Sequence, residues 1–229
     1  MKTIGLIGGM SWESTRLYYA LLNETVRARL GGLHSADILL RSVDFAPVAA
    51  MQSAGAWDEA GRLLADVARS LEAAGAGVIG LATNTMHKVA PAITTAVSVP
   101  FIHIAEPTAA ALIRDGRRQP LLLATRFTME EPFYLGLLQA KGLAPVVPDA
   151  AGRAEVHRVI YEELCLGRVE GASRRTYEAL IETARRSGAD SVILGCTEVC
   201  LLVGPENAAL PVYDTTALHV GALVDAALG

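Results

Sequence analysis

Two short polar segments that occupy the same place in a repeated pattern are the first candidates for chemistry in this sequence. Residues 75–85 and residues 188–198 align at a constant offset, which pairs Thr83 with Cys196. Each of the two residues follows an apolar run typical of a buried strand. A hydroxyl and a thiol can both carry protons, so this pair could act as acid and base.

Two further pairs of segments repeat in the same order along the chain. Residues 5–13 are similar to residues 122–130, and residues 99–103 are similar to residues 210–214. Any one similarity could arise by chance, but three in the same order predict two similar half-domains. Half-domains that face each other would place Thr83 and Cys196 on opposite walls of one cleft.

Cys196 is the stronger of these two candidates. It follows Gly195 at a strand end and precedes Thr197 near a predicted helix start. The dipole of a helix lowers the pKa of a thiol at its N-terminus, and the thiolate is the reactive form. A buried structural cysteine would have the same sequence context, so position alone leaves both interpretations open. Cys165 and Cys200 fall on helix-like stretches and are interpreted as packing residues.

The elements that must position these residues alternate along the chain, because apolar runs alternate with amphipathic stretches. The expected strands cover residues 3–7, 37–43, 78–82, 101–104, 121–124, 145–147, 191–194 and 212–214. The expected long helices cover residues 12–30, 57–74, 154–165, 173–187 and 216–228. Shorter helices are expected from Met86, Thr108 and Thr128, the last because Glu131 follows at capping-box spacing.

Continuous apolar strands between helices are typical of parallel sheets that are covered on both faces. We therefore expect an α/β fold of two pseudo-symmetric, Rossmann or flavodoxin-like half-domains with the active site in the cleft between them. The segments near Pro100 and Pro211 are the expected crossings. The predicted domains are residues 1–98 with 213–229, and residues 99–212.

Ligands of open α/β sheets bind beyond the carboxyl ends of the strands. That rule selects the loops at residues 8–11, 83–85, 125–128 and 195–198. Free N–H groups at the following helix starts favour an anion such as a carboxylate. The residues that we expect to contact substrate are Met10, Ser11, Gln52, Asn84, Thr85, Thr125, Thr197 and Glu198.

Several of these loop residues also have ordinary structural interpretations. Thr83 alone would be a turn hydroxyl, and only its register with Cys196 favours catalysis. Asn84 and Thr85 either bind a substrate carboxylate or cap the next helix. Glu198 either orients the thiol or favours a helix N-terminus.

Other site types find little support in the sequence. Gly8-Gly9 is only part of a dinucleotide-binding loop, since the full Gly-x-Gly-x-x-Gly pattern is absent. No cluster of His, Cys and Asp has metal-ligand spacing, and His87 and His103 are interpreted as structural. We therefore expect a protein that works without a cofactor or a metal ion.

The composition is that of a globular protein. Apolar residues make up 52% of the 229 residues, charged residues 19%, and the net charge is −4. No Lys/Arg block is present, so nucleic-acid binding is not expected. No apolar run is long enough to span a membrane, and the N-terminus does not have the pattern of a signal peptide. Three cysteines, an odd number, are not expected to form a disulfide framework. A cytoplasmic location is the expectation.

Four motifs resemble those of the aspartate/glutamate racemase family. They are GGMSWEST at residues 8–15, TNTMHK at 83–88, YEEL at 161–164 and GCTE at 195–198. The resemblance covers essentially the whole chain and is strongest to the bacterial L-aspartate/glutamate or broad-specificity amino-acid racemases. It implies a homodimeric, pyridoxal-phosphate-independent enzyme of D-amino-acid metabolism with two pseudo-symmetric α/β halves.

The resemblance also implies a role for each matched residue. In the family, two residues, usually both cysteines, face each other across the substrate Cα; one removes the α-proton and the other delivers a proton to the opposite face. Cys196 matches the second cysteine and Thr83 matches the first position. Asn84 and Thr85 match the pair that holds the α-carboxylate, and Thr197 is the matching threonine in the second half.

Two departures from the family pattern change the expectations. Thr83 replaces a thiol by a far less acidic hydroxyl, so we expect one enantiomer, L by analogy, to be processed better. Some aspartate-specific members hold the distal carboxylate with basic residues, but the matching positions here are Val48 and Leu166; Arg168 lies just beyond. A neutral polar substrate such as homoserine therefore competes with aspartate and glutamate.

Three functions stay open on the sequence alone. The first is a cofactor-independent racemase, and the second is a related decarboxylase or isomerase that protonates a planar intermediate from one side through Cys196. The third is a binding protein or regulator that kept the cleft and lost turnover. The match at residues 8–15 favours the racemase.

Overall fold

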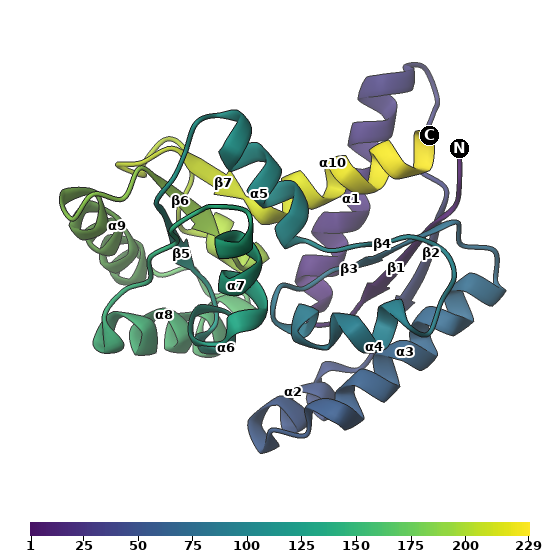
Figure 1. The fold of residues 1–229 in the computed structure, drawn as a ribbon, viewed down its shortest axis with the longest axis horizontal. Helices are drawn as coiled ribbons and strands as arrows, with labels where there is room; N and C mark the ends of the chain where they lie inside the picture. The colour runs from purple at the N-terminus through teal and green to yellow at the C-terminus, as the bar shows by residue number, and fades with distance from the viewer. The chain divides into compact units, whose positions relative to one another are not determined.

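The computed structural model describes all residues from Met1 to Gly229, and the chain forms two compact units. Unit 1 comprises Met1–His103 and His219–Gly229, and unit 2 comprises Ile104–Leu218. Both are α/β units built on parallel sheets, as the sequence predicted (Figure 1). None of the helices combines the length and the hydropathy that a membrane span requires.

Unit 1 contains a four-stranded parallel sheet in the order β2-β1-β3-β4. The strands are β1 (Ile4–Gly8), β2 (Ile38–Ser42), β3 (Val78–Leu81) and β4 (Phe101–Ile102). The helices are α1 (Trp12–Leu30), α2 (Phe45–Ala54), α3 (Trp57–Ala73), the 3-10 helix η1 (Thr85–Val89) and α4 (Ala90–Thr94). The last helix, α10 (Thr215–Leu228), begins in unit 2 and ends in unit 1.

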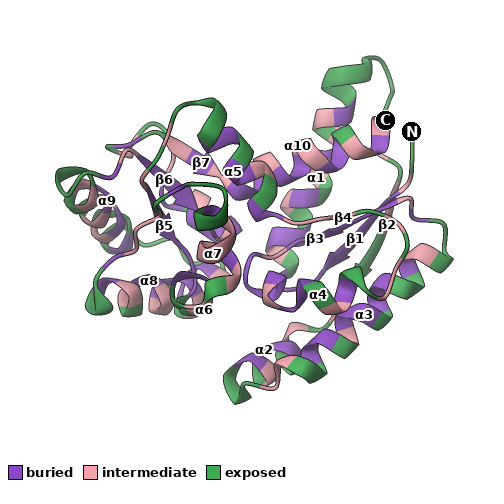
Figure 2. Ribbon diagram, in the orientation of Figure 1, coloured by how far each residue is buried: buried purple, intermediate pink, exposed green.

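Apolar side chains cover both faces of this sheet, and Figure 2 shows β1 and β3 as buried strands. Ile79 on β3 and Leu64 on α3 belong to one apolar cluster. Leu6 on β1, Leu22 on α1 and Leu223 on α10 belong to another. A strand buried on both faces has no position for a polar side chain, which explains the continuous apolar runs in the sequence.

Unit 2 contains a three-stranded parallel sheet in the order β5-β6-β7. Its strands are β5 (Pro120–Leu123), β6 (Ser191–Leu194) and β7 (Val212–Asp214). Its α-helices are α5 (Ala105–Arg114), α6 (Arg126–Glu130), α7 (Pro132–Ala140), α8 (Ala150–Glu162) and α9 (Gly171–Arg186). Two 3-10 helices, η2 (Leu164–Leu166) and η3 (Thr197–Leu201), complete the unit.

The two units repeat each other in backbone detail as well as in strand direction. Gly75 after α3 and Gly188 after α9 both have φ of 102°. The N–H of Ala82 donates to the neighbouring strand β1 at 2.8 Å, and the N–H of Gly195 donates to the neighbouring strand β5 at 2.8 Å. Both pairs have the offset found in the sequence, so the residues that follow β3 and β6 occupy equivalent positions.

The chain crosses between the units after β4 and after β7. The sequence placed the crossings at 98/99 and 212/213, whereas the structure places them at 103/104 and 218/219. β4 belongs to unit 1 because it pairs with β3, and β7 belongs to unit 2 because it pairs with β6. The end of α10 is held in unit 1 by a 2.7 Å hydrogen bond from the Lys2 N–H to the Ala227 carbonyl.

Several local expectations were wrong, including the start of α5, expected at Thr108, and the bounds of α8, expected at 154–165. The helix expected from Thr128 begins earlier, as α6, and Glu131 is extended because Pro132 follows it. The strand expected at residues 145–147 is reduced to one parallel bridge between Val146 and Leu121. Helix α2 was not expected, and it is capped by Asp44, whose carboxylate accepts from the α2 backbone at 3.2 Å.

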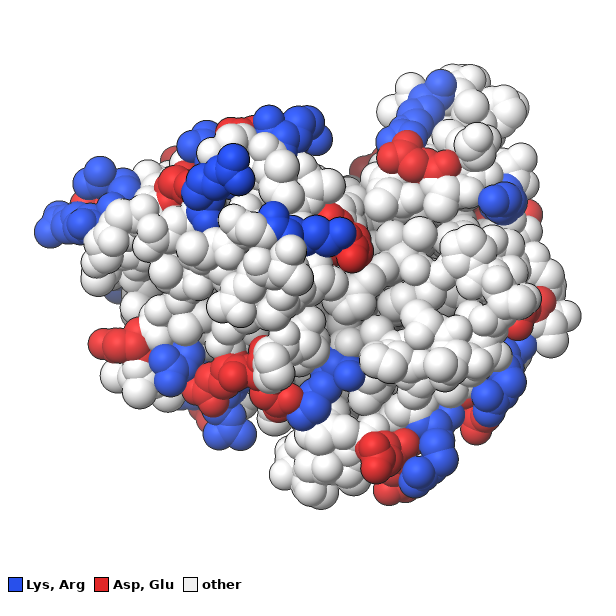
Figure 3. All heavy atoms as spheres, in the orientation of Figure 1, with Lys and Arg blue, Asp and Glu red and all other residues white.

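Charged side chains of both signs are interspersed on the face drawn in Figure 3. Several charges pair within one helix, such as Arg158 with Glu155 at 2.8 Å and Arg185 with Glu182 at 2.7 Å. Exposed pairs of this kind contribute little to stability, typically about 0.2–1 kcal/mol. Their distribution agrees with the absence of a basic block in the sequence.

Candidate active site

The loop after β1 is held in a fixed shape by its own polar groups. Thr15 Oγ1 accepts from the Gly9 N–H at 2.7 Å and donates to the Ser11 carbonyl at 2.9 Å. Ser11 Oγ caps α1 by accepting from a backbone N–H at 3.3 Å. Gly9 has φ of 95°, and a Cβ there would lie 2.1 Å from the Val43 carbonyl oxygen, so only glycine fits. Met10 and Ser11 are both buried, and the peptide between them is cis.

The loop after β3 carries three of the predicted residues at the same edge of the sheet. β1 and β3 are neighbours in register, with Ile7 opposite Leu81. Thr83 is partly exposed, whereas Asn84 and Thr85 are 4% and 5% exposed. The loops after β1 and β3 therefore bring Met10, Ser11, Thr83, Asn84 and Thr85 to one sheet edge.

Asn84 does not cap the helix that follows it. Its backbone is already helical, with φ of −71° and ψ of −49°, and its side chain makes no capping hydrogen bond to η1. The capping interpretation of Asn84 is therefore excluded.

Gln52 on α2 lies beside the β3 loop. Its side chain is 4% exposed, and Nε2 donates to the sulfur of Met86 at 3.0 Å. Met86 immediately follows Thr85 in η1, so this bond places the Gln52 amide next to the loop. Val48, one turn earlier on α2, is fully buried as well.

The loop after β6 places the Cys196 thiol against a buried carboxylate. The Cys196 thiol donates to Oε2 of Glu198 at 2.9 Å, and Thr197 Oγ1 donates to the same oxygen at 2.7 Å. Glu198 is 5% exposed. The preceding Gly195 packs closely on β5, because a Cβ there would lie 2.8 Å from the Leu122 side chain.

This environment raises the pKa of the Cys196 thiol well above its ordinary value. Burial is the largest cause, followed by the charge of the Glu198 carboxylate and the electrostatic interaction with Cys165. The sequence predicted the opposite direction, on the basis of a helix dipole. That prediction was wrong because burial and the Glu198 carboxylate dominate, while the following helix, η3, is a short 3-10 helix with a small dipole. The resting side chain is therefore a protonated thiol.

Thr125 lies at the same edge of the unit 2 sheet as Cys196. β5 and β6 are neighbours in register, with Leu123 opposite Leu194. Thr125 is 5% exposed, and its hydroxyl lies 3.2 Å from the hydroxyl of Thr128. Unit 2 therefore brings together Thr125, Cys196, Thr197 and Glu198, the four residues predicted from its sequence.

Two tyrosines of unit 2 also lie near the thiol. Burial is the largest cause that raises the pKa values of Tyr161 and Tyr177, and the electrostatic interaction with Cys196 is the second. Tyr177 was not singled out in the sequence, where its helical spacing marks it only as a core residue. It is fully buried and donates to the Val156 carbonyl at 3.1 Å.

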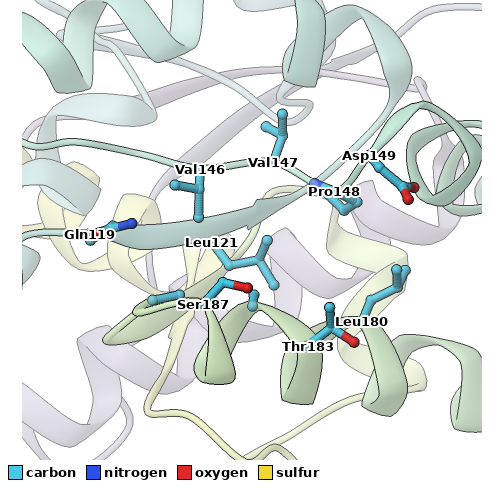
Figure 4. A pocket seen from close by; sticks show the side chains of 11 residues that line it. Gln119, Leu121, Val146, Val147, Pro148, Asp149, Leu180, Thr183 and Ser187 are labelled. Carbon is cyan, nitrogen blue, oxygen red and sulfur yellow. The ribbon is translucent and has the colours of Figure 1, made fainter.

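A separate hollow of about 340 Å³ lies in unit 2 between α9 and the segment that leads into α8 (Figure 4). Its walls include Leu121, Val146, Pro148 and Leu180, with Gln119 at one end. None of the residues predicted to act on a substrate lines it. The hollow is therefore distinct from the candidate active site.

Two α/β units with proton-carrying side chains at equivalent strand ends define the class of a two-domain racemase fold. The family model described as Asp/Glu/Hydantoin racemase matches residues 7–223. This chain belongs to that family and is therefore an isomerase.

Known relatives support the assignment. The structure of a Yersinia pestis protein assigned to the Asp/Glu racemases is 49% identical, covers 100% of both chains and has a TM-score of 0.93. An aspartate racemase homologue from Pyrococcus horikoshii OT3 is 34% identical over 100% of both chains, with a TM-score of 0.87. A broad specificity amino-acid racemase, RacX of Bacillus subtilis (strain 168), is 25% identical over 162 residues, which cover 70% of this chain and 69% of RacX.

Proposed function

We propose that this protein is a cofactor-independent amino-acid racemase in which Thr83 and Cys196 exchange the substrate α-proton on opposite faces. The observation that carries the proposal is the structural equivalence of these two residues. Thr83 follows β3 and Cys196 follows β6, and each of these strands lies in the interior of its sheet. The residue just before each one donates a backbone hydrogen bond of 2.8 Å to the neighbouring strand. Stereoinversion at Cα requires two acid/base groups, one for each face.

Cys196 serves one face together with Glu198. In the resting protein the thiol proton lies in the hydrogen bond to Glu198 Oε2. When Cys196 acts as base, that proton passes to the carboxylate, and the thiolate then takes the α-proton. When Cys196 acts as acid, the thiol donates directly to the carbanion.

Thr83 serves the other face, either directly or through a water molecule that its hydroxyl holds. Thr83 is partly exposed, unlike the buried residues on either side of it. A hydroxyl is a weak base beside a thiol, so the two faces are expected to differ in rate. The supporting observation is a difference between the two halves. Cys196 has the buried carboxylate of Glu198 beside it, and the residue at the matching position after Thr83 is Thr85.

Asn84, Thr85 and Thr197 are proposed to hold the α-carboxylate. All three are buried polar residues at strand ends, and Asn84 does not cap η1. Without an electron sink, the carbanion must be stabilised by positioned N–H and O–H donors in a site that excludes water. Met10, Ser11, Gln52 and Thr125 are proposed to contact the rest of the substrate.

The preferred substrate is proposed to be a neutral polar amino acid such as homoserine, ahead of aspartate and glutamate. Val48 is fully buried and Leu166 is exposed, and neither can pair with a distal carboxylate. Arg168 is exposed, and its guanidinium donates to the Glu162 carbonyl. At these matched positions an acidic side chain would find no cationic partner.

A one-sided protonation, as in a related decarboxylase or isomerase, is the second candidate. The protonated Cys196 thiol favours it, because a resting acid can protonate a planar intermediate without help from Thr83. Formation of the opposite enantiomer from a pure amino acid separates the two functions, since only a racemase inverts Cα.

The proposed function is tested by incubating the protein in D2O with a panel of L- and D-amino acids and following Cα by NMR and chiral chromatography. We expect deuterium in both enantiomers of at least one neutral polar amino acid, unaffected by a chelator or a carbonyl reagent and abolished by thiol alkylation. Binding of an amino acid without any exchange would instead identify a binding protein, and loss of exchange on chelation would refute the cofactor-independent mechanism.

The homodimer implied by the family resemblance is part of the same proposal. The monomer mass is 24.1 kDa, and a dimer has twice that mass. Light scattering on the purified protein measures it directly, and a monomeric mass would exclude the dimer.

A further inference from the structure

A buried histidine holds the backbone of the loop that carries Thr83. His87 lies on η1 and is 1% exposed, and its Nδ1 is 2.8 Å from the Thr83 carbonyl oxygen. A carbonyl oxygen can only accept a hydrogen bond, so Nδ1 carries the proton and donates it. The backbone N–H of His87 also donates to the Asn84 carbonyl, at 3.1 Å. One residue thus binds the carbonyls of two of the three loop residues.

His87 keeps this bond as a neutral side chain. Burial, together with the nearby His103 and His219, holds the pKa of His87 well below its ordinary value. The imidazole therefore stays in the tautomer that has its proton on Nδ1 throughout the neutral pH range. The donor to Thr83 is consequently constant, and the loop does not depend on a titration of His87.

Neighbouring side chains fix the orientation of the His87 ring. The ring centroid lies 4.5 Å from that of His103, 5.6 Å from that of Phe101 and 5.9 Å from that of His219. His219 is itself clamped, since its Nε2 is 2.8 Å from the Ile102 carbonyl and its Nδ1 is 2.8 Å from the Tyr18 hydroxyl. By the same argument Nε2 donates to Ile102, and Nδ1 accepts from Tyr18.

The second unit has no equivalent of this arrangement. His87 stands four residues after Thr83, and the residue at the matching place after Cys196 is Cys200, which has no ring nitrogen. Cys196 has a different neighbour in Glu198, which binds its thiol directly. Each half therefore supports its own proton carrier in its own way: a carboxylate for the thiol, and a backbone clamp for the hydroxyl.

We propose that His87 is a positioning residue for Thr83, because it holds the Thr83 carbonyl. Proton exchange on the Thr83 face of the substrate then depends on His87, and exchange on the Cys196 face does not. The inference rests on the proposed function. The direction of the Thr83 carbonyl sets the peptide plane between Thr83 and Asn84, and with it the placement of the hydroxyl and the Asn84 N–H. A misplacement of about 1 Å in such a group can cost about 100-fold in rate.

The test measures, in D2O, the deuterium that appears at Cα of each recovered starting enantiomer. Such exchange with retention needs only the group on the face from which the proton leaves, so each enantiomer reports one face. Thr83→Ala and Cys196→Ser assign the two enantiomers to their faces. The same measurements in a Thr83→Cys background make the Thr83 face easily measurable.

His87→Leu should lower exchange on the Thr83 face about 10–100-fold and leave exchange on the Cys196 face within about two-fold. His87→Asn should restore most of the loss, because its amide N–H replaces Nδ1–H, whereas His87→Gln should not. If His87→Leu does not fold, the comparison of His87→Asn with His87→Gln tests the proposal instead. The matched control is His219→Gln, because His219 is buried in the same cluster but makes no bond to Thr83. This substitution should change proton exchange equally on the two faces of the substrate.

Different outcomes identify different failures. Equal loss on both faces in His87→Leu, or equal exchange in the Asn and Gln variants, would overturn the positioning role while leaving the racemase intact. No exchange by the unmodified protein with any amino acid would instead defeat the proposed function, and the positioning role with it.

Discussion

Cys196 and Thr83 differ in what surrounds them as much as in their own chemistry. The thiol shares a buried carboxylate oxygen with Thr197, and this negative charge opposes ionisation. A thiol with a raised pKa is a poor resting nucleophile but a good proton donor. Glu198 then has two effects: it keeps the proton on sulfur in the free protein, and it can take that proton when a thiolate is needed.

The first prediction concerns Glu198→Gln. A neutral amide removes the charge that opposes the thiolate, so the pKa of Cys196 should fall and alkylation should begin at lower pH. Exchange on the Cys196 face should nevertheless fall, by about 10²–10⁴-fold, because Gln cannot accept the thiol proton. Mass spectrometry of the Cys196 peptide after pulses of iodoacetamide at a series of pH values measures the first effect. An alkylation profile that is unchanged or moves to higher pH would contradict it.

Thr83→Cys is the second prediction at this scale. It places a thiol at the position equivalent to Cys196, and a thiol is a far better acid/base than a hydroxyl. Exchange of the disfavoured enantiomer should rise by up to about 10²–10⁴-fold, the range typical of a well-placed general acid or base. Deuterium incorporation into each enantiomer, with the unmodified protein as control, measures the change. Equal rates from both enantiomers in the unmodified protein would show that the hydroxyl is no handicap.

The positions of the candidate residues could be predicted from sequence, but their ionisation could not. The repeat alone identifies Thr83 and Cys196, because strand ends follow from apolar runs and their offset. The pKa of Cys196 depends first on its burial and then on where the Glu198 side chain points, and both are set by packing. His87 looked like an ordinary structural histidine, because nothing in the sequence shows that its ring turns back to Thr83.

At the scale of elements, close packing between strand ends positions the site. Gly195 lets β6 approach β5 so closely that a Cβ would lie 2.8 Å from Leu122 and 2.9 Å from Ala124. Gly9 plays the same part in unit 1, against the backbone of Val43. Gly195 thus brings the ends of β6 and β5 together, and Gly9 brings the β1 loop against the residue that follows β2.

Gly195→Ala tests this packing. Its Cβ cannot be accommodated without movement, so the free energy of unfolding should fall by about 1–3 kcal/mol, and exchange through Cys196 should fall with it. Gly136→Ala on α7 is the matched control, because its Cβ would find its nearest neighbour at 3.9 Å and alanine favours a helix by about 0.5–1 kcal/mol. Urea unfolding measures both. A Gly195→Ala protein as stable as the parent would show that the ends of β5 and β6 can accommodate a Cβ at this position.

Long elements with clear end signals were predictable, and short ones were not. α1 begins after its Ser11 cap and ends before Gly31, as its sequence indicates. α6 and α7 are separated only by an extended Glu131 before Pro132, and the capping-box spacing at Thr128 misplaced the start. β4 has two residues, too few for any periodicity, and its membership of unit 1 follows only from pairing with β3.

At the scale of the whole molecule, the chain builds one α/β unit, then a second, and returns through α10 to the first. The repeat made this order predictable, while the exact crossings depended on which sheet the short strands joined. The return brings His219 between Tyr18 and Ile102, so a residue near the C-terminus completes the interior of unit 1.

This return predicts a specific acid sensitivity. Burial is the largest cause that lowers the pKa of His219, to about 4 from its ordinary 6.5. Between those values the unfolded chain binds a proton that the folded protein does not, so stability falls as the pH falls from about 6.5 to about 4. The contribution lost is about 3 kcal/mol. His219→Gln keeps a donor to Ile102 but cannot titrate, so urea titrations should show a shallower loss in acid. Parallel pH profiles for the two proteins would contradict the assignment.

The most direct test of the account as a whole is the fate of the α-proton in D2O with Cys196→Ser beside the unmodified protein. Serine keeps the size and a hydrogen bond to Glu198 but cannot supply a thiolate. With chelator present, the unmodified protein should convert one enantiomer of its best substrate into the other, carrying deuterium at Cα. The variant should fold, as judged by circular dichroism, and yield no inverted product. Inversion by Cys196→Ser at the parent rate would contradict the central claim that Cys196 carries the proton on one face.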